Sequence, residues 1–198
     1  MSVDYRIYDE RFFRNTVAFE AASAHSVVRI LSKYFSPRSV IDIGCGAGVY
    51  LEEFMKNGVT VLGVEGSPAA LKVANIKEHI IIRDLCQPLR IPDQFDLCLC
   101  LEVAEHLPPA CSEILVENSI KLSDTIVFTA ATPGQGPASI GHINEQPPEY
   151  WLKKYSRFGY RLDPVLTEKI KGEMEIAKVV WWIVKNMMIL KKLWVKKI

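Results

Sequence analysis

Apolar residues follow two alternating patterns along the chain, and these patterns predict helices and buried strands in turn. Between residues 11 and 35, apolar side chains are spaced by threes and fours, as on one face of a helix that Ser36-Pro37 would end. Continuous apolar runs predict strands at 40–43, 59–64, 80–82, 95–101 and 125–130. Helices are expected between them at 49–56, from Ser67-Pro68 to about Asn75, and at 109–121. A helix at 148–157, a strand at 160–166 and a helix–strand unit from about Glu173 to Val195 complete the chain.

Strands that alternate with helices predict an α/β fold. Parallel strands need crossover connections, and a covering helix on each face usually supplies them. A chain of 198 residues fits one domain of this kind.

Composition and charge exclude several classes without selecting a function. Apolar residues make up 49% of the chain, charged residues 24%, and the net charge is +1, as in an ordinary globular protein. No apolar run reaches the roughly 18 residues of a spanning helix, and the charged N-terminus does not resemble a secretory signal. The five cysteines include no C-x-x-C pair, which argues against a disulfide framework or zinc knuckle and for a reducing cytosol. We therefore expect a cytoplasmic protein.

One glycine-rich stretch organises the rest of the chain. Val40-Ile41-Asp42-Ile43 is followed by glycines at 44, 46 and 48, which predicts a buried strand turning sharply into a helix around a ligand. The dinucleotide pattern G-x-G-x-x-G is not matched, because Val49 stands at its third glycine. Asp42 would repel a pyrophosphate and suits a cationic amine or sulfonium. A glycine-rich turn without a ligand is the alternative.

The stretch resembles the first motif of the class I S-adenosylmethionine-dependent methyltransferases, E/D-x-G-x-G-x-G. Asp42, Gly44, Gly46 and Gly48 match that motif, and Cys45 lies within it. The resemblance extends over about residues 38–190. It implies a Rossmann-like three-layer α/β sandwich whose seven-stranded sheet is mostly parallel, with an antiparallel last strand. It also implies that S-adenosylmethionine is the cofactor.

Residues at later strand ends are predicted to complete the cofactor site. Glu65, with Gly66 beside it, stands at the end of the second strand, where a carboxylate can accept hydrogen bonds from ribose hydroxyls. The alternative is that Glu65 is a solvated acid at a strand end. The resemblance implies that Asp84 and Leu85 hold the adenine, although Asp84 could instead pair with Arg83. It also places Leu101 and Glu102, after the fourth strand, beside the cofactor.

The segment Glu102-x-x-Glu105-His106 resembles two relatives. They are the ubiquinone-type O-methyltransferases and the terminal-ribose methyltransferases of small RNAs. In the latter, these residues and a later histidine, here His142, bind a divalent metal; two carboxylates and two imidazoles suit such a cation. The metal is thus a second candidate cofactor. Alternatively, Glu102 contacts the methionine amine and His106 is a lone base or a packing residue. His106 and His142 are the candidate catalytic bases.

The remainder of the chain is predicted to bear on substrate and partners. A loop at 132–148 rich in proline and glycine is a candidate wall of the active site. We expect one domain, with an N-terminal helical cap (1–37), a cofactor-binding half (38–131) and a substrate-side half (132–198). In the basic, aromatic C-terminus, Met187–Leu190 should lie in the core, leaving Leu193–Ile198 as a tail that could touch a membrane surface.

The prediction for function is S-adenosylmethionine-dependent methyl transfer to an oxygen or nitrogen nucleophile of a small molecule. A metal-dependent ribose 2′-O-methyltransferase acting on RNA is disfavoured, because the chain has no basic excess and no appended RNA-binding module. DNA is not expected as a partner. A non-catalytic cofactor-binding protein is the remaining alternative, and the polar residues His142, Asn144 and Glu145 in the loop argue against it.

Overall fold

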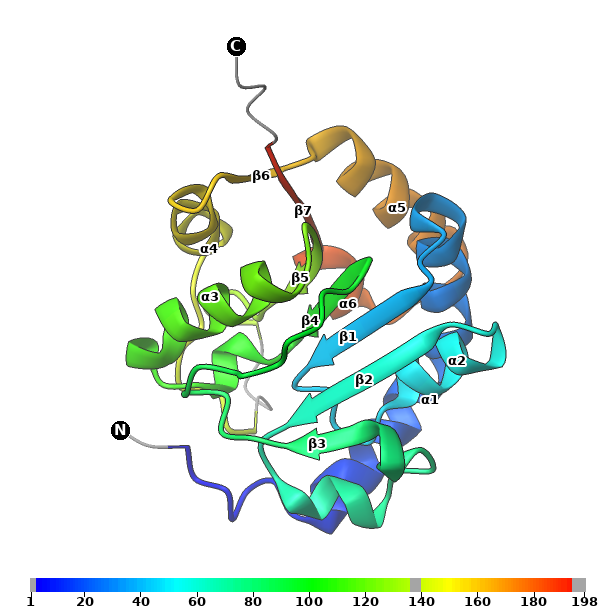
Figure 1. Cartoon of the computed structure of the whole chain (residues 1–198), viewed down its shortest axis with the longest axis vertical. Coiled ribbons are helices and arrows are strands. Elements are labelled where there is room, and N and C mark those ends of the chain that lie inside the picture. The colour runs from blue at the N-terminus through cyan, green and yellow to red at the C-terminus, as the bar shows by residue number, and fades with distance from the viewer. Residues whose placement is uncertain (1–2, 136–139, 194–198) are drawn as a thin grey trace.

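A seven-stranded sheet forms the centre of the molecule in a computed structural model that describes residues 3–135 and 140–193. The strands are β1 (Ser39–Ile43), β2 (Thr60–Glu65), β3 (Ile80–Ile82), β4 (Leu97–Leu101), β5 (Thr125–Thr129), β6 (Tyr160–Leu162) and β7 (Met188–Lys192). Their order is β3-β2-β1-β4-β5-β7-β6 (Figure 1). The first five pair in parallel, whereas β7 runs antiparallel to both β5 and β6. The predicted fold class is therefore confirmed, including the antiparallel last strand.

Helices cover the sheet on both sides and make three layers (Figure 1). They are α1 (Glu10–Phe35), α2 (Val49–Lys56), α3 (Ser112–Leu122), α4 (Pro148–Ser156), α5 (Pro164–Ile176) and α6 (Trp181–Asn186). Short 3₁₀ turns lie at Pro68–Lys72, Lys77–His79, Ala104–His106 and Pro109–Cys111. One core cluster joins α1, α2, α5 and α6 to the sheet, and the other joins α3 and α4 to its opposite face.

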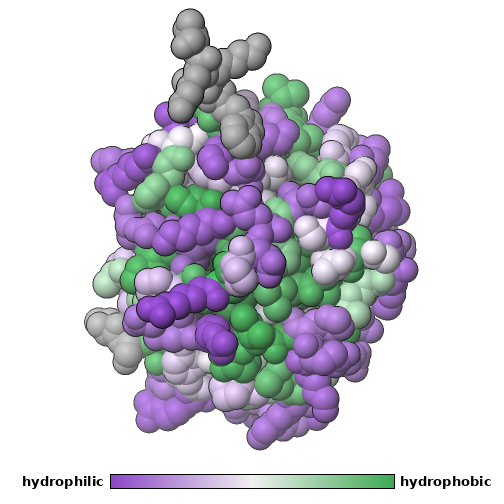
Figure 2. Space-filling model, in the orientation of Figure 1, coloured by the Kyte–Doolittle hydropathy of each residue, from purple (hydrophilic) through white to green (hydrophobic). Residues whose placement is uncertain are grey.

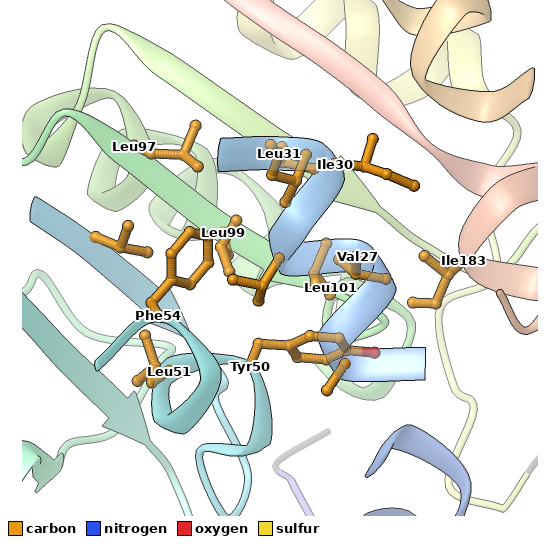
Figure 3. Packing of buried hydrophobic residues seen from close by; sticks show 14 of the residues in the cluster. Val27, Ile30, Leu31, Tyr50, Leu51, Phe54, Leu97, Leu99, Leu101 and Ile183 are labelled. Atoms are coloured by element: carbon orange, nitrogen blue, oxygen red, sulfur yellow. The ribbon is translucent and has the colours of Figure 1, made fainter. Parts of the chain in front are cut away.

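Helix α1 owes its position to the apolar stripe that the sequence predicted. Val27, Ile30 and Leu31 are buried and share a core cluster with Leu97 and Leu99 of β4 (Figure 3). The helix begins at Asp9, whose side chain accepts a hydrogen bond from the Phe12 amide at 2.8 Å. Burying side chains of this size stabilises the fold by about 1.5–3 kcal/mol each, so the stripe holds α1 on the sheet.

The connection from β3 to β4 contains neither an α-helix nor a 3₁₀ turn, whereas α2 and α3 follow β1 and β4 and two 3₁₀ turns follow β2. Residues 83–96 form turns and irregular structure, from which partly buried side chains such as Leu89 and Phe95 pack against the core. Figure 2 shows apolar side chains reaching the surface in the middle of a mainly polar face. Irregular structure therefore takes the place of a covering helix in this one crossover.

Helix α5 is the largest correction to the predicted elements. The strand predicted over 160–166 stops at Leu162, and a 13-residue helix occupies Pro164–Ile176. Asp163 caps this helix by accepting from the Leu166 amide at 3.0 Å, and Pro164 has the fixed φ that suits a first helical turn. Similarly, Ser67 caps as predicted, but the turn after it is the 3₁₀ helix Pro68–Lys72 and does not continue to Asn75.

The C-terminal strand is buried as predicted. Met187, Met188, Ile189 and Leu190 are all buried, whereas Leu193 is exposed. The predicted surface tail falls mostly on residues 194–198, which lie outside the described residues, and so do 136–139 of the loop. Among the helices that the structure describes, none has the length and hydropathy to cross a membrane. The division of the chain into a cap and two halves stays a prediction.

The cysteines require a correction, because their spacing predicted no disulfide. Cys86 and Cys111 form one, 25 residues apart in sequence, whereas Cys45, Cys98 and Cys100 are buried free thiols. The turn after β3 crosses to the turn that precedes α3, and this proximity depends on the tertiary fold rather than on cysteine spacing. The structure therefore differs from the prediction that all five cysteines are reduced.

Candidate active site

The glycine loop between β1 and α2 has a backbone that side chains would disturb. Gly44, Gly46 and Gly48 all have positive φ, at 79°, 54° and 77°. A Cβ on Gly44 would lie 2.4 Å from a methyl group of Val103, so this position also lacks the space for alanine. Cys45 is buried between them, and its thiol pKa is raised well above its usual range by burial. The loop thus has the shape that a closely approaching ligand needs.

Glu65, at the end of β2, ties the glycine loop to the next strand. Its two carboxylate oxygens accept hydrogen bonds from the Gly46 amide at 3.0 Å and the Ser67 amide at 2.8 Å. Burial raises the pKa of Glu65, and the backbone amides of Ser67, Gly46 and Gly66 oppose that rise. Each carboxylate oxygen has a second lone pair, so Glu65 can still accept from a ligand hydroxyl.

Asp42, on β1, brings a second buried carboxyl group to this edge of the sheet. Its exposed fraction is 2%, and its side chain makes no hydrogen bond with any residue that the structure describes. Burial, followed by the charge of Glu65, raises the pKa of Asp42 to about 7. A carboxyl group held this way gains most from a cation placed beside it.

The two residues predicted to hold the adenine, Asp84 and Leu85, lie in different surroundings, one at the surface and one in the core. Asp84 is exposed, and its carboxylate accepts from the Cys86 amide at 2.9 Å; in the described residues it forms no ion pair with Arg83. Leu85 is buried in the core with an exposed fraction of 4%. Tyr5 lies over Gly66, where an added Cβ would be 3.1 Å from its ring. Tyr5, which the sequence did not indicate, is therefore better placed than Leu85 to cover an adenine.

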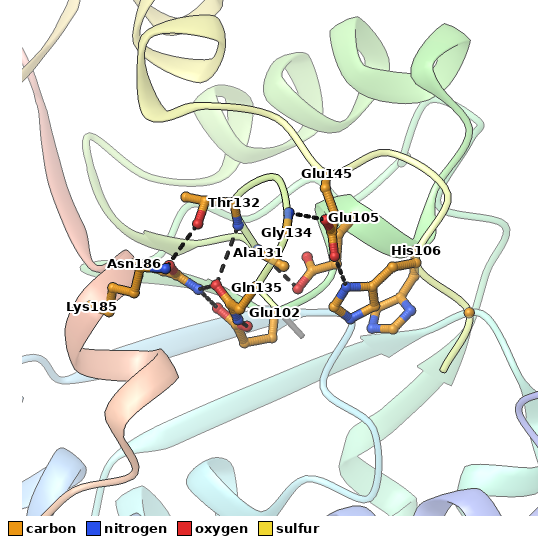
Figure 4. Close-up of polar contacts among 12 residues, drawn as sticks. Glu102, Glu105, His106, Ala131, Thr132, Gly134, Gln135, Glu145, Lys185 and Asn186 are labelled. Carbon is orange, nitrogen blue, oxygen red and sulfur yellow. Dashed lines mark hydrogen bonds and ion pairs between the residues drawn. The ribbon is translucent and has the colours of Figure 1, made fainter. Parts of the chain in front are cut away.

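Glu102 follows β4 in a strained conformation. Its φ is 54°, and its amide donates to the hydroxyl of Thr129 at 2.9 Å. The carboxylate accepts from the side-chain amides of Asn186 at 3.0 Å and Gln135 at 3.4 Å (Figure 4). Burial raises the pKa of Glu102, while the hydrogen bond from Asn186 opposes that rise most strongly. Leu101, just before it, is buried. Segments from β4, the loop after β5 and α6 thus converge on one carboxylate.

Glu105, His106 and His142 form a compact cluster on the other side of the site. One potential ligand atom from each lies within 4.8 Å of the others, and Glu102 is outside this set. The Glu105 carboxyl group is fully buried; one oxygen accepts from the Ala131 amide at 3.1 Å, and the other has no partner. Burial, and then the Glu102 charge, raise the pKa of Glu105 well above its usual range. Both effects favour the uncharged form of the Glu105 carboxyl group.

The two imidazoles meet edge to face, with ring centroids 4.8 Å apart. His106 Nδ1 lies 3.1 Å from the Tyr8 hydroxyl, and His142 Nδ1 lies 2.8 Å from a carboxylate oxygen of Glu145. Burial, with a smaller effect from His142, lowers the pKa of His106 to about 4. His106 is thus neutral across the physiological range. In both rings Nδ1 is engaged, so Nε2 is the nitrogen that can act on a ligand.

Comparison with known proteins identifies the architecture. A profile of the family described as "Methyltransferase domain" matches residues 41–118, the part of the chain that holds the glycine loop, Glu65 and the Glu102–His106 segment. Residues 41–118 therefore match a methyltransferase domain. This confirms the resemblance inferred from the glycine loop.

The methyltransferase domain is similar to two ubiquinone biosynthesis O-methyltransferases. The protein from Pseudomonas fluorescens SBW25 is 30% identical over 123 residues, which cover 57% of this chain and 47% of that protein. The protein from Pseudomonas syringae pv. tomato is 34% identical over 87 residues, covering 39% of this chain and 37% of that protein. At most about half of each relative's length is thus spanned.

Solved structures share the fold of the methyltransferase domain. A SAM-dependent methyltransferase from Archaeoglobus fulgidus matches with a TM-score of 0.64 and 20% identity, covering 91% of this chain and 99% of that one. An O-methyltransferase from a trans-AT PKS multienzyme of Brevibacillus brevis, solved with S-adenosyl-L-homocysteine, has a TM-score of 0.60 and 15% identity. Its match covers 84% of this chain and 70% of that chain. At these identities the likeness shows the fold alone.

The methyltransferase domain also has site residues that the sequence did not reveal. The N-terminal segment crosses the site, because the Ser67 hydroxyl donates to the Tyr8 carbonyl at 2.7 Å and the Tyr8 hydroxyl reaches His106. Gln135 and Asn186 hold Glu102 (Figure 4). Glu145 holds His142. A tyrosine before α1 and an amide at the last residue of α6 carry no motif by themselves, so only the fold brings these side chains to the site.

Proposed function

We propose that this chain transfers the methyl group of S-adenosylmethionine to a hydroxyl group of a small molecule. The observation that carries the proposal is the arrangement at the carboxyl ends of β1, β2 and β4. There the glycine loop and a group of acidic side chains lie on one side of a pair of histidines. Open α/β sheets bind their ligands at this edge.

The residues present fit S-adenosylmethionine, a ligand with a sulfonium and an ammonium. The glycine loop gives the backbone close access, and Glu65 has lone pairs for ribose hydroxyls. Asp84 would accept from the adenine amine, with Tyr5 over the ring. The carboxyl groups of Asp42 and Glu102 favour a positively charged methionine portion. When bound, S-adenosylmethionine supplies an activated methyl group on its sulfonium.

His142 is the better placed general base. Its Nδ1–H donates to the Glu145 carboxylate, which fixes the ring and leaves Nε2 free to take a hydroxyl proton. His106, with its pKa near 4, is a weak base at neutral pH. Its Nε2 is free only in the tautomer whose Nδ1–H donates to Tyr8, whose own hydroxyl then donates to the Gly141 carbonyl at 3.4 Å. His106 therefore positions the acceptor hydroxyl, and His142 removes its proton.

Apolar side chains near the histidines indicate the kind of acceptor. Tyr8 and Phe12 meet His106 edge to face, and Ile140 and Ile143 in the following loop are 64% and 44% exposed. An apolar phenol or catechol would bury this surface, whereas an RNA ribose would gain little from it. The relatives are named for O-methylation, which also favours oxygen over nitrogen. Ribose methylation of RNA remains the less favoured alternative.

The three-residue cluster also fits a divalent metal. The unpartnered oxygen of Glu105 and the Nε2 atoms of His106 and His142 would be its ligands, since both Nδ1 atoms have the hydrogen-bond partners that orient metal-binding histidines. Glu102 would not belong to this set. A metal bound there would lower the pKa of the acceptor hydroxyl.

Partners and location are proposed only in outline. A small molecule is the proposed substrate, and no DNA partner is proposed. Contact of the C-terminal tail with a membrane surface, and a cytoplasmic location, extend the predictions from sequence. The disulfide between Cys86 and Cys111 makes the reducing cytosol the weaker part of that proposal.

A transfer assay tests the proposed function. The chain would be incubated with S-adenosylmethionine and a panel of apolar phenols and catechols, and mass spectrometry would follow both the methyl ether and S-adenosylhomocysteine. The proposal predicts that both products form together and that His142→Ala slows them. Methylation of RNA riboses with no phenol methylated would contradict it.

A further inference from the structure

Helix α1 carries an acidic residue on the face that packs against the rest of the protein. Glu20 is seven residues from Phe13 and seven from Val27, both of which are buried. Residues seven apart lie on the same side of a helix, so Glu20 points in the direction of these apolar side chains. The stripe that predicts α1 from sequence thus contains a carboxylate where a core residue would be expected.

This face of α1 lies against the cofactor loop. An added Cβ on Gly46 would be 3.7 Å from the ring of Phe13, one helical repeat before Glu20. Glu20 is only partly buried by its neighbours, and it makes no hydrogen bond or ion pair with any residue between 3 and 135 or 140 and 193. Ala21 and Ala24 line one cavity with Ala47 and Val49, so the part of α1 that carries Glu20 lies beside the glycine loop.

Three other acidic side chains at the carboxyl edge of the sheet interact with Glu20. Burial, and then the charges of Asp42, Glu102 and Glu65 in decreasing order, raise the pKa of Glu20 to about 8. No lysine or arginine among the described residues contributes to this shift or to that of Asp42. Glu20 thus interacts electrostatically with Asp42, Glu102 and Glu65. These four carboxyl groups are close enough to interact, and among the described residues no lysine or arginine offsets their charge in the space between them.

Tyr50, in the first turn of α2, supplies the second and independent observation. Its exposed fraction is 3%, and its hydroxyl has no hydrogen-bond partner. The side chain reaches helix α1 close to Val27 (Figure 3). Among the charges that raise the pKa of Tyr50, Glu20 comes first, followed by Asp42 and Glu102. A buried hydroxyl without a hydrogen-bond partner is unfavourable, so this one marks a place for a ligand atom.

Asn186 adds a further buried acceptor on the Glu102 side of the same space. Its amide nitrogen donates to Glu102 and Gln135, but its Oδ1 has no partner. The space therefore offers a carboxylate, a hydroxyl and an amide oxygen, all able to accept. An ammonium group has three N–H donors and no acceptor, and it matches this set.

We propose that Glu20 and Tyr50 form the subsite for the ammonium group of the methionine portion of S-adenosylmethionine. This inference rests on the proposed function. The sulfonium is excluded as the group that Glu20 binds, because a transferable methyl group must face the histidines. Glu20 is not among the charges that shift the pKa of Tyr8 or His106 on that side.

Isothermal titration of the intact chain tests the subsite with three ligands. S-adenosylmethionine and S-adenosylhomocysteine both carry the ammonium, whereas 5′-methylthioadenosine has neither ammonium nor carboxylate. Glu20→Gln should weaken the first two by about tenfold or more, the effect of losing one charge-assisted hydrogen bond, and leave 5′-methylthioadenosine within about twofold. Tyr50→Phe should act in the same direction without loss of thermal stability, because it removes a hydroxyl that has no partner.

Glu10→Gln is the matched control, since Glu10 is on the same helix but pairs with Arg14 at the surface. It should leave all three affinities unchanged. Unaltered S-adenosylhomocysteine binding by Glu20→Gln would overturn the inference, and so would an equal loss of 5′-methylthioadenosine binding. If the wild-type chain bound neither S-adenosylmethionine nor S-adenosylhomocysteine, the proposed function itself would fail, which is a separate result.

Discussion

His142 Nδ1 lies 2.8 Å from the Glu145 carboxylate, three residues further along the loop after β5. The second oxygen of Glu145 accepts from the Gly134 amide at 2.9 Å, so both ends of this carboxylate are held. An imidazole oriented by a fixed carboxylate presents its other nitrogen in one direction. This pair is therefore the part of the site on which proton removal depends.

His142→Ala should lower kcat/KM for the acceptor by about 10²-fold or more, the contribution of a general base. Glu145→Gln should have a smaller effect, about tenfold, because the imidazole remains but loses the charge that orients it. His25→Ala is the control, since His25 is exposed on α1. Equal activity of His142→Ala and wild type would remove His142 from the mechanism.

Gly44→Ala tests whether the loop tolerates any side chain. The added Cβ would meet Val103 at 2.4 Å at a φ of 79°, and overpacking with backbone strain should cost about 2–4 kcal/mol of unfolding free energy. Gly58→Ala is the matched control, because Gly58 has a φ of 76° and nothing within 4 Å of the added Cβ. It should cost only about 1–2 kcal/mol. Urea denaturation measures both, and similar losses would show that the Val103 contact is unimportant.

The acidic space predicts that cofactor affinity depends on pH. Asp42 and Glu20 have pKa values raised to about 7 and about 8, so both carry protons below those values when no cation is bound. Binding a cation favours the charged carboxylates, so affinity should rise as pH increases from about 6 to 8, with release of protons. Titration in two buffers of different ionisation enthalpy measures that release, which Glu20→Gln should reduce. Affinity that falls over this range would contradict the assignment.

The same shifts have the opposite effect on the protein without its ligand. Where a carboxyl group has a higher pKa in the folded than in the unfolded state, the free energy of unfolding falls as pH rises between the two pKa values. The free chain should therefore be less stable at pH 8 than at pH 6. Saturation with S-adenosylmethionine should reduce the difference.

The disulfide predicts a response to reducing agents. Cys86 and Cys111 close a loop of 25 residues, and opening it should cost about 3–4 kcal/mol of unfolding free energy. Dithiothreitol should therefore lower the midpoint of thermal unfolding. The double variant Cys86→Ser, Cys111→Ser is the control and should not respond to dithiothreitol. A wild-type chain that is equally unresponsive, with all five thiols reactive after denaturation, would show that the bridge does not form.

Local signals in the sequence determined most of the fold. Asp42, the three glycines and Glu65 are close in sequence to the strands that position them, so their predicted placement at strand ends is what the structure shows. Helix α5 was missed, although Asp163-Pro164 is a start signal, because the apolar residues that follow it also suit a strand.

The site was less predictable, because its other residues come together only through tertiary packing. Tyr8 and His106 are 98 residues apart, and Asn186 and Glu102 are 84 apart. Glu20 gave a weak signal, an acid within an apolar stripe, which becomes informative once Tyr50 is found beside it without a partner. Cysteine spacing likewise could not reveal the contact between Cys86 and Cys111.

The central claim is that the carboxyl edge of this sheet binds S-adenosylmethionine, and calorimetric titration of the intact chain tests it most directly. The ligands would be S-adenosylmethionine, S-adenosylhomocysteine and NAD, each at pH 8, where Asp42 is mostly charged and Glu20 is about half charged. We predict one bound equivalent of either adenosyl ligand and no heat from NAD. Binding of NAD alone would contradict the account.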